Sequence, residues 1–344
     1  MRTIDLRSDT VTKPTPEMLE AMFQAEVGDD VFEEDPTVKK LEEKAAALFG
    51  KEMAMFVPSG TMANQVAIKL LTHSQEEVIC DKLSHIYYYE AGGVFSNSGI
   101  SMRMIDGNRG RITAAQVEEN INDAQNIHFP LTSLVSIENT CNKGGGSFYQ
   151  IEEMKSLHTV AQKYHLKMHM DGARIFNAVT ETKDDLLEIG KLFDTISFCL
   201  SKGLGAPVGS LVLSTRENIH KGKRIRKAFG GAMRQAGYLA AAGIYALDHH
   251  RNRLADDHHR AKLLSQTIKS CSFTADVLPV ETNILVFRLV EQLPLTRFIQ
   301  LLAERNIKAV PFGKQTIRMV THLDFTDEML DETVNTIRQI AQKF

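Results

Sequence analysis

The stretch TISFCLSKGLGAPVGSLVLS, residues 195–214, holds two short apolar runs around a glycine-rich segment. Apolar runs of this length between turn residues predict buried β-strands, here over 195–200 and 209–214. Four similar runs precede this stretch and alternate with helical patterns. They are MAMFV (53–57), EVICD (77–81), LVSIEN (134–139) and LKMHMD (166–171). The alternation predicts an α/β fold with a mostly parallel sheet covered by helices.

The pattern changes beyond Gly237. A long helical stretch through Ser270 is followed by elements expected in the order strand, helix, strand, helix, at 283–289, 295–305, 316–321 and 327–343. This order predicts a small α+β domain at the C-terminal end. We therefore expect a large domain over 1–250, with an N-terminal arm, and a small domain over 251–344.

Composition and charge narrow the class of function. The 344 residues are 43% hydrophobic and 24% charged with a formal net charge of -3, which is typical of a globular protein with a small-molecule ligand. Neither a nucleic acid nor a membrane partner is expected, because the charge is near neutral and the longest apolar run, Tyr238–Leu247, is too short to span a bilayer. The four cysteines lie far apart in sequence, so we expect reduced thiols in the cytoplasm and no zinc site.

Glycine motifs for dinucleotides and for ATP are absent. A different candidate is FVPSGTMAN at 56–64, where a strand gives way to a helix at Ser59, Gly60 and Thr61. Backbone N–H groups and two hydroxyls at this helix start would suit a phosphate. The same residues also fit a simple N-cap.

A second candidate, HMDGAR at 169–174, places Asp171 and Arg174 at the end of an apolar strand. In open parallel sheets, ligands gather beyond the carboxyl ends of the strands, so these side chains would face a crevice. The alternative is a structural ion pair between the two.

The third candidate is Lys202, which follows a buried strand directly and is surrounded by small residues. Burial lowers the pKa of a lysine and favours the nucleophilic amine, so a Schiff-base role explains this setting better than a surface role. A phosphate cup, an acid and a lysine, each after a strand, together meet the requirements of pyridoxal 5'-phosphate. Asp171 would then pair with the pyridinium nitrogen.

Long motifs also make the chain similar to the L-threonine aldolase family of fold type I pyridoxal-phosphate enzymes. The motifs are DLRSDTVTKPT (5–15), GDDVFEEDPTV (28–38), PSGTMANQ (58–65), HIYYYEAGG (85–93), ENTCNKGGG (138–146), MDGARIFNA (170–178), SKGLGAPVGS (201–210), GGAMRQAG (230–237) and IRMVTHLD (317–324). The resemblance implies a seven-stranded sheet in the large domain. It also implies cleavage of a β-hydroxy-α-amino acid, typically threonine or allo-threonine, to glycine and an aldehyde.

The resemblance assigns catalytic roles to Lys202, to Asp171 and to His85, whose imidazole would stack on the cofactor ring. It implies cofactor contacts for Ser59, Gly60, Thr61, His85, Asp171, Arg174, Ser201, Lys202, Lys227 and Arg234. Part of the basic pair Lys227 and Arg234 comes from a neighbouring subunit in the family, so a homo-oligomer, a dimer of dimers, is expected. The substrate carboxylate is expected to bind Ser8, Arg174 and Arg318.

One residue departs from the family pattern. Many relatives carry histidine where this chain has Cys141, and the resemblance implies that this position contacts the substrate hydroxyl. A thiol is a poor hydrogen-bonding group, so the preference between threonine and allo-threonine is open. The alternative is that Cys141 points into the core.

Two rival functions share the same cofactor residues: a β-eliminating lyase acting on another β-substituted amino acid, and a catalytically silent cofactor-binding protein. The basic run at 220–227 is interpreted as a solvated helix face with one phosphate contact across a subunit boundary. The histidines at 249, 250, 258 and 259 are likewise interpreted as a solvated face, and no metal site is expected.

Overall fold

The computed structural model describes residues 2–344, and within them the largest sheet has seven strands in the order β2-β8-β7-β6-β5-β3-β4. These strands are β2 (Met53–Val57), β3 (Glu77–Asp81), β4 (Ser101–Ile105), β5 (Thr132–Glu138), β6 (Lys167–Asp171), β7 (Thr195–Cys199) and β8 (Ser210–Ser214). β8 runs antiparallel to β2 and β7, and the other neighbours are parallel. The expected α/β class with a mostly parallel sheet is confirmed.

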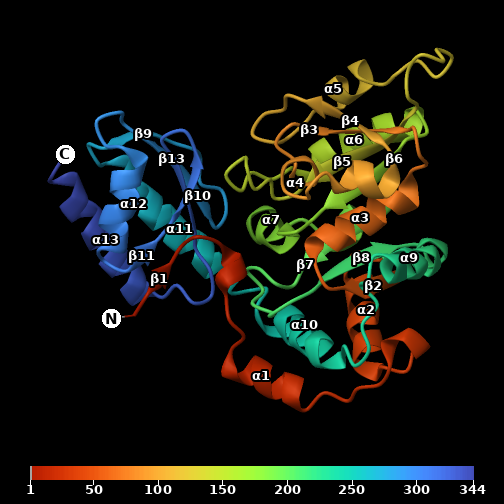
Figure 1. The fold of residues 1–344 in the computed structure, drawn as a ribbon, viewed down its shortest axis with the longest axis horizontal. Coiled ribbons are helices and arrows are strands. Elements are labelled where there is room, and N and C mark those ends of the chain that lie inside the picture. The colour runs from red at the N-terminus through yellow and green to blue at the C-terminus, as the bar shows by residue number, and fades with distance from the viewer. Residues whose placement is uncertain (1) are drawn as a thin grey trace.

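Helices cover both faces of this sheet, as Figure 1 shows. They are α1 (Pro16–Phe23), α2 (Pro36–Phe49), α3 (Gly60–Leu71), α4 (His85–Tyr88), α5 (Ala114–Glu119), α6 (Ile151–Lys163), α7 (Ile175–Thr182), α8 (Leu186–Lys191), α9 (Arg216–Ala228) and α10 (Gly237–His249). Short turns of other helix types lie at η1 (Asp9–Val11), η2 (Asp30–Phe32) and η3 (Val94–Ser98).

A smaller antiparallel sheet follows, in the order β12-β13-β10-β9. Its strands are β9 (Thr274–Val277), β10 (Ile284–Leu289), β12 (Val310–Gly313) and β13 (Thr316–Val320), and its helices are α11 (Leu254–Lys269), α12 (Leu295–Ala303) and α13 (Asp327–Ala341). The N-terminal strand β1 (Ile4–Asp5) pairs in parallel with β11 (Ile307–Lys308) beside this sheet. The first residues of the chain thus lie next to some of the last (Figure 1).

Two separate hydrophobic clusters underlie the two sheets. One joins α2, the large sheet and α10, and the other joins α11, α12, α13 and the small sheet. Ile4 and Leu6 of the N-terminal arm are buried in the second cluster. The arm therefore belongs by packing to the C-terminal part of the chain. None of the helices within residues 2–344 combines the length and apolar character needed to cross a bilayer.

Helix α2 illustrates how local sequence sets an element. Asp35 caps its start by accepting hydrogen bonds from the backbone N–H groups of Thr37 (3.1 Å) and Val38 (2.9 Å). Pro36 occupies the first turn, where no N–H is needed, and Gly50 ends the helix with a positive φ of 61°. These boundaries agree with the sequence pattern.

Two sequence expectations about this part of the fold are wrong. The helical stretch expected from 237 to 270 breaks between α10 and α11, because His250 turns inward and its Nδ1 bonds the carbonyl of Leu204 at 2.7 Å. His258 is also buried, with Nδ1 2.6 Å from Glu181. The four histidines are therefore not one solvated face.

The basic run of α9 is only partly solvated. Arg226 is buried, its Nη1 donates to the carbonyl of Phe56 at 2.7 Å, and its Nη2 pairs with Asp30 at 3.0 Å. This guanidinium ties α9 to the outer edge of β2.

Candidate active site

A cavity of about 330 Å³ lies where the ends of the large-sheet strands meet the small sheet and the N-terminal arm. It is lined by Ser8, Thr10, His85, Tyr89, Asn142, Arg174, Lys202, Val310, Pro311, Phe312 and Arg318. Five residues expected at the site from sequence, namely Ser8, His85, Arg174, Lys202 and Arg318, therefore line one space. They come from both ends of the chain.

Asp171 ends β6 and is buried beside this cavity. Its Oδ2 accepts a hydrogen bond from Asn64 Nδ2 at 2.8 Å, and its Oδ1 accepts one from the Ala173 N–H at 3.1 Å. In the described part of the chain Asp171 makes no ion pair with Arg174, which pairs with Asp9 instead. The alternative of a structural ion pair between Asp171 and Arg174 is therefore wrong. Two N–H donors thus hold the carboxyl group in place, as a partner for a ring N–H requires.

Asn64 is held by four contacts of its own. Its Oδ1 accepts hydrogen bonds from Ser197 Oγ (2.7 Å) and from His169 Nε2 (3.2 Å). Burial lowers the pKa of His169 to about 4, so its ring is neutral. These two bonds fix the amide so that its nitrogen faces Asp171.

Arg174 pairs with Asp9 of the N-terminal arm. Its Nε and Nη2 bind the two carboxylate oxygens at 2.7 Å each, and both side chains are buried. Burial favours the neutral acid, but Arg174 outweighs it and lowers the pKa of Asp9 far below its usual range. Nη1 and one hydrogen of Nη2 remain for a second carboxylate, because a guanidinium has five N–H donors.

Arg318 enters the cavity from β13 of the small sheet. Its Nη1 donates to Asn142 Oδ1 at 2.7 Å, and its Nη2 donates to the carbonyl of Arg7 at 2.9 Å. Its Nε is buried without a hydrogen-bond partner. Burial and the nearby Arg174 lower the pKa of Arg318 to about 10. An incoming carboxylate would stabilise this cation.

His85 begins the short helix α4 at the end of β3. Its Nδ1 lies 2.9 Å from Glu90 Oε1, and its backbone N–H donates to Glu138 Oε2 at 2.9 Å. Burial lowers the pKa of His85, but the Glu90 bond and the nearby Asp171 and Glu138 together raise it above the usual value. The imidazole therefore carries a proton more readily than a free histidine.

Glu138 ends β5 next to Asp171 on β6. Burial, with the adjacent Asp171, raises the pKa of Glu138 to about 7. Its Oε1 accepts the N–H of Asn142 at 2.9 Å, so it also orients the loop that meets Arg318.

Lys202 lies in the turn after β7, half-buried, with its side chain at the cavity. The turn is held from behind, since the carbonyl of Lys202 accepts the Gly205 N–H at 2.8 Å and Leu204 is bound by His250. Gly205 has a φ of 80°, a conformation that favours glycine. The small residues around Lys202 are thus part of the turn that aims it.

The start of α3 offers the expected phosphate donors. Ser59 Oγ caps the helix by accepting the Met62 N–H at 3.2 Å, while the N–H groups of Gly60 and Thr61 in the first turn have no intrahelical acceptor. A Cβ on Gly60 would lie 2.7 Å from Cys199 Sγ, so only glycine fits there. Ser210 Oγ nearby is buried without a partner. This donor set suits a phosphate, and with Asp171 and Lys202 it suits pyridoxal phosphate.

Arg234, Lys227 and Cys141 were also expected at the site, and they do not line this cavity in the described part of the chain. Arg234 pairs with Asp29 at 2.9 Å, and Lys227 lines a separate surface hollow of about 590 Å³ beside α9. Cys141 is fully buried, and a Cβ on Gly110 would lie 2.0 Å from its Sγ. Its backbone pairs with Ser147, and the buried thiol beside Gly110 is consistent with the alternative of a core position.

Several residues that hold the site together through hydrogen bonds are not predicted as site residues from the sequence. They are Asp9, Asn64, Glu90, Glu138 and Asn142. Each lies within a motif that was recognised for its neighbours. The sequence feature that could have indicated such a residue is a charged residue inside or directly after an apolar strand, as with Glu138 at the end of β5.

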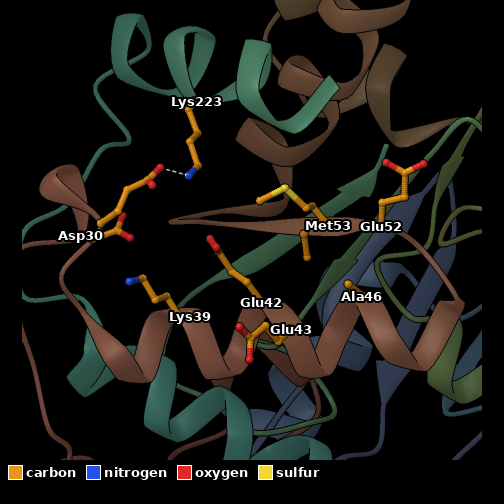
Figure 2. Close-up of a pocket in the computed structure, with 10 residues that line it drawn as sticks. Asp30, Lys39, Glu42, Glu43, Ala46, Glu52, Met53 and Lys223 are labelled. Carbon is orange, nitrogen blue, oxygen red and sulfur yellow. Dashed lines mark hydrogen bonds and ion pairs between the residues drawn. The ribbon is translucent and has the colours of Figure 1, made fainter. Parts of the chain in front are cut away.

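A second cavity, of about 210 Å³, lies on the far side of β2 between α2 and α9 (Figure 2). Glu42 points into it from α2, and its Oε1 accepts the Phe56 N–H at 2.8 Å. Burial raises the pKa of Glu42 to about 7. Glu42 and Arg226 together satisfy both backbone groups of Phe56 on this edge strand.

The fold and the cavity together define a fold type I pyridoxal-phosphate enzyme. The β-eliminating lyase family matches residues 5–292 of the chain. The low-specificity L-threonine aldolase of Escherichia coli K12 is 44% identical over 334 residues, covering 96% of each chain. The probable low-specificity L-threonine aldolase 2 of Arabidopsis thaliana is 38% identical over 348 residues, covering 99% of this chain and 98% of that one.

A solved threonine aldolase structure from Leishmania major superposes with a TM-score of 0.84 at 20% identity, covering 98% of this chain and 99% of that one. This likeness supports the fold. The chain belongs to the β-eliminating lyase family and, within it, to the low-specificity L-threonine aldolases. It is a pyridoxal-phosphate-dependent lyase.

Proposed function

We propose that this protein cleaves L-threonine and L-allo-threonine, and related β-hydroxy-α-amino acids, to glycine and an aldehyde. The observation that carries the proposal is the meeting of Lys202, Arg174 and Arg318 at one cavity in a chain 44% identical to the E. coli L-threonine aldolase. When bound, pyridoxal phosphate supplies the electron sink for the broken Cα–Cβ bond.

Residues of this chain would hold the cofactor in place. Lys202 would hold the cofactor through its amine, Asp171 would keep a positive charge on the ring nitrogen, and the N–H groups at the start of α3 would bind the phosphate. Ser201, next to the lysine, would add a hydroxyl.

Two guanidinium groups would bind the substrate carboxylate from opposite sides of the cavity. Arg174 offers the edge that Asp9 leaves free, and Arg318 lines the cavity with a second guanidinium. Ser8 lies beside them on the N-terminal arm. Fixing the carboxylate fixes the direction of the bond to be broken.

His85 would accept the proton of the β-hydroxyl group through Nε2, because Nδ1 is engaged by Glu90. A bound water between His85 and the hydroxyl is the alternative acceptor. The full burial of the Cys141 thiol supports a core position rather than a contact with the substrate hydroxyl.

We also propose a dimer-based homo-oligomer, a homotetramer, in the cytoplasm. Lys227 and Arg234 lie outside the cavity of their own chain, which supports a role at a neighbouring subunit. Four free cysteines are consistent with a reducing compartment. The proposed domains are a large one over 1–250 and a small one over 251–344. The two hydrophobic clusters support a division near residue 250, while Ile4 and Leu6 of the arm pack with the second cluster.

The test is an amino-acid panel with the purified holoenzyme. L-threonine and L-allo-threonine should release glycine and aldehyde in equal amounts, whereas a β-eliminating lyase would release ammonia and a keto acid. Lys202→Ala should abolish turnover, and borohydride should no longer fix the cofactor to the chain. Multiple turnovers by Lys202→Ala would overturn the proposal.

A further inference from the structure

Glu90 is a buried carboxylate directly behind His85. It receives three hydrogen bonds: Oε1 faces Asn64 Nδ2 at 2.8 Å and His85 Nδ1 at 2.9 Å, and Oε2 accepts from Gln65 Nε2 at 2.6 Å. Two of these partners are amide N–H groups, which can only donate. Both carboxyl oxygens of Glu90 therefore face hydrogen-bond donors.

The acceptor role of the Glu90 oxygens determines which imidazole nitrogen carries hydrogen. A carboxylate accepts only, so Nδ1 of His85 must be the protonated nitrogen in the neutral ring. Nε2 then has a free lone pair, and among the described residues it has no hydrogen-bond partner in the structure. Because the ring lines the cavity, this lone pair is the basic group available there.

Asn64 links the same carboxylate to Asp171. Its Nδ2 donates to Glu90 Oε1 and to Asp171 Oδ2, both at 2.8 Å. One polar atom from each of His85, Glu90 and Asp171 lies within 4.8 Å of the others. Two carboxylates this close would repel each other, and the amide hydrogens between them offset that repulsion.

We propose that Glu90 is a positioning residue that holds His85 in the Nδ1–H tautomer and turns Nε2 to the cavity as the proton acceptor, while Asn64 separates its charge from that of Asp171. This inference rests on the proposed function for the identity of the proton that Nε2 receives. The pairing itself rests on the geometry around Glu90 alone.

Other charged groups around His85 are accounted for in the same geometry. Asp171 and Glu138 act on it electrostatically, Lys202, Arg174 and Arg318 line the same cavity, and the ring of Tyr89 lies 5.4 Å from it. Among the acids, Glu90 alone contacts the ring, since Glu138 binds the backbone N–H of His85 and Asp171 binds Asn64. Removing the charge of Glu90 should therefore act on the ring without moving the helix start.

The experiment compares wild type with Glu90→Gln, Glu90→Asp and the control Gln65→Ala. Gln65 contacts Glu90 on the oxygen that does not meet His85, so Gln65→Ala perturbs the same carboxylate without touching the ring. Long-range ¹H–¹⁵N spectra of the ¹⁵N-histidine-labelled holoenzyme report tautomer and pKa, and the His85 signal is identified by its loss in His85→Asn. The neutral, buried His169 serves as an internal reference.

Glu90→Gln should lower the pKa of His85 by about one unit or more and abolish the pure Nδ1–H tautomer, because the paired charge is gone. The acid limb of the kcat/KM profile should move down by the same amount. Glu90→Asp keeps the charge but shortens the side chain, so it should retain more of the raised pKa than Glu90→Gln. Gln65→Ala should keep the wild-type tautomer.

An unchanged His85 tautomer and pKa in folded Glu90→Gln would overturn the proposal. Should Glu90→Gln not fold, a Glu90→Asp protein with wild-type tautomer, pKa and acid limb would also overturn it. The proposed function fails separately, if the wild-type holoenzyme releases no glycine from L-threonine while the spectra show the Glu90 effect.

Discussion

Asp171 is oriented by Asn64, which lies 107 residues earlier in the sequence and donates a hydrogen bond to its carboxyl group. Asp171→Asn would remove the charge that faces the cofactor ring and would leave the phosphate donors at α3 intact. We expect cofactor binding to persist and kcat to fall by about 10²- to 10³-fold, the loss typical of one preorganised electrostatic partner.

Steady-state kinetics on L-threonine, with cofactor content measured by absorbance, will check the Asp171 prediction. Asp81→Asn is a suitable control, because this acid also ends a strand of the large sheet but bonds the N–H groups of Leu83 and Gly107. A kcat near wild type in Asp171→Asn would mean that another acid serves the ring nitrogen.

Cys141 leads to a different prediction at the same scale. Its Sγ packs toward Gly110, so Cys141→Ser should leave the ratio of kcat/KM for L-threonine and L-allo-threonine unchanged. The buried hydroxyl would lack a good acceptor and should cost about 1 to 3 kcal/mol of unfolding free energy. Parallel kinetics and thermal melting measure the two effects. A several-fold change of the ratio in a normally stable variant would return position 141 to the site.

At the scale of elements, the outer edge of β2 is held by titratable side chains. The pKa of Glu42 is about 7 in the folded protein, against an ordinary value of 4.5. Between pH 4.5 and pH 7 the Glu42 carboxyl group is therefore protonated in the folded protein and ionised in the unfolded chain. Stability is therefore highest below pH 4.5 as far as Glu42 is concerned, and this contribution is lost as pH rises through 7.

Glu42→Gln should keep the hydrogen bond to Phe56 and remove the cost of ionising a buried acid. Its gain in unfolding free energy over wild type should grow from near zero at acid pH to on the order of 2 kcal/mol above pH 7. Thermal melting across this pH range is the measurement, with the exposed neighbour Glu43→Gln as the control. A gain that does not depend on pH would contradict the assignment.

The same scale shows what the sequence could and could not predict. The strands ending at Asp171 and before Lys202 were predictable because long apolar runs end at a charged residue. β4 was missed because SMRMI alternates polar and apolar residues at a partly exposed edge of the sheet. The sequence predicts either the substrate or Asp171 as the partner of Arg174. In the structure its partner is Asp9, which lies 165 residues away in the sequence. Local patterns cannot rank such distant pairings.

At the scale of the whole molecule, Arg318 connects the small sheet to the loop after β5 through Asn142. Arg318→Ala should raise the KM for L-threonine by about ten- to a hundredfold, because a hydrogen-bonded charge pair with the carboxylate is lost. We expect kcat to fall less. Asn142→Ala removes the bridge but keeps the guanidinium, so its KM should change less. An unchanged KM in Arg318→Ala would place the carboxylate elsewhere.

The N-terminal arm has a consequence for biosynthesis. Ile4 and Leu6 bond to Asn306 and Lys308, so these residues of the arm meet their partners only after residues 306–308 have been made. Until then these two apolar side chains of the arm lack their native contacts, and the cavity lacks Arg318. Nascent chains halted before residue 306 should therefore carry a folded large sheet but a protease-sensitive arm, and a bulky fusion at the arm should harm catalysis more than one after α13.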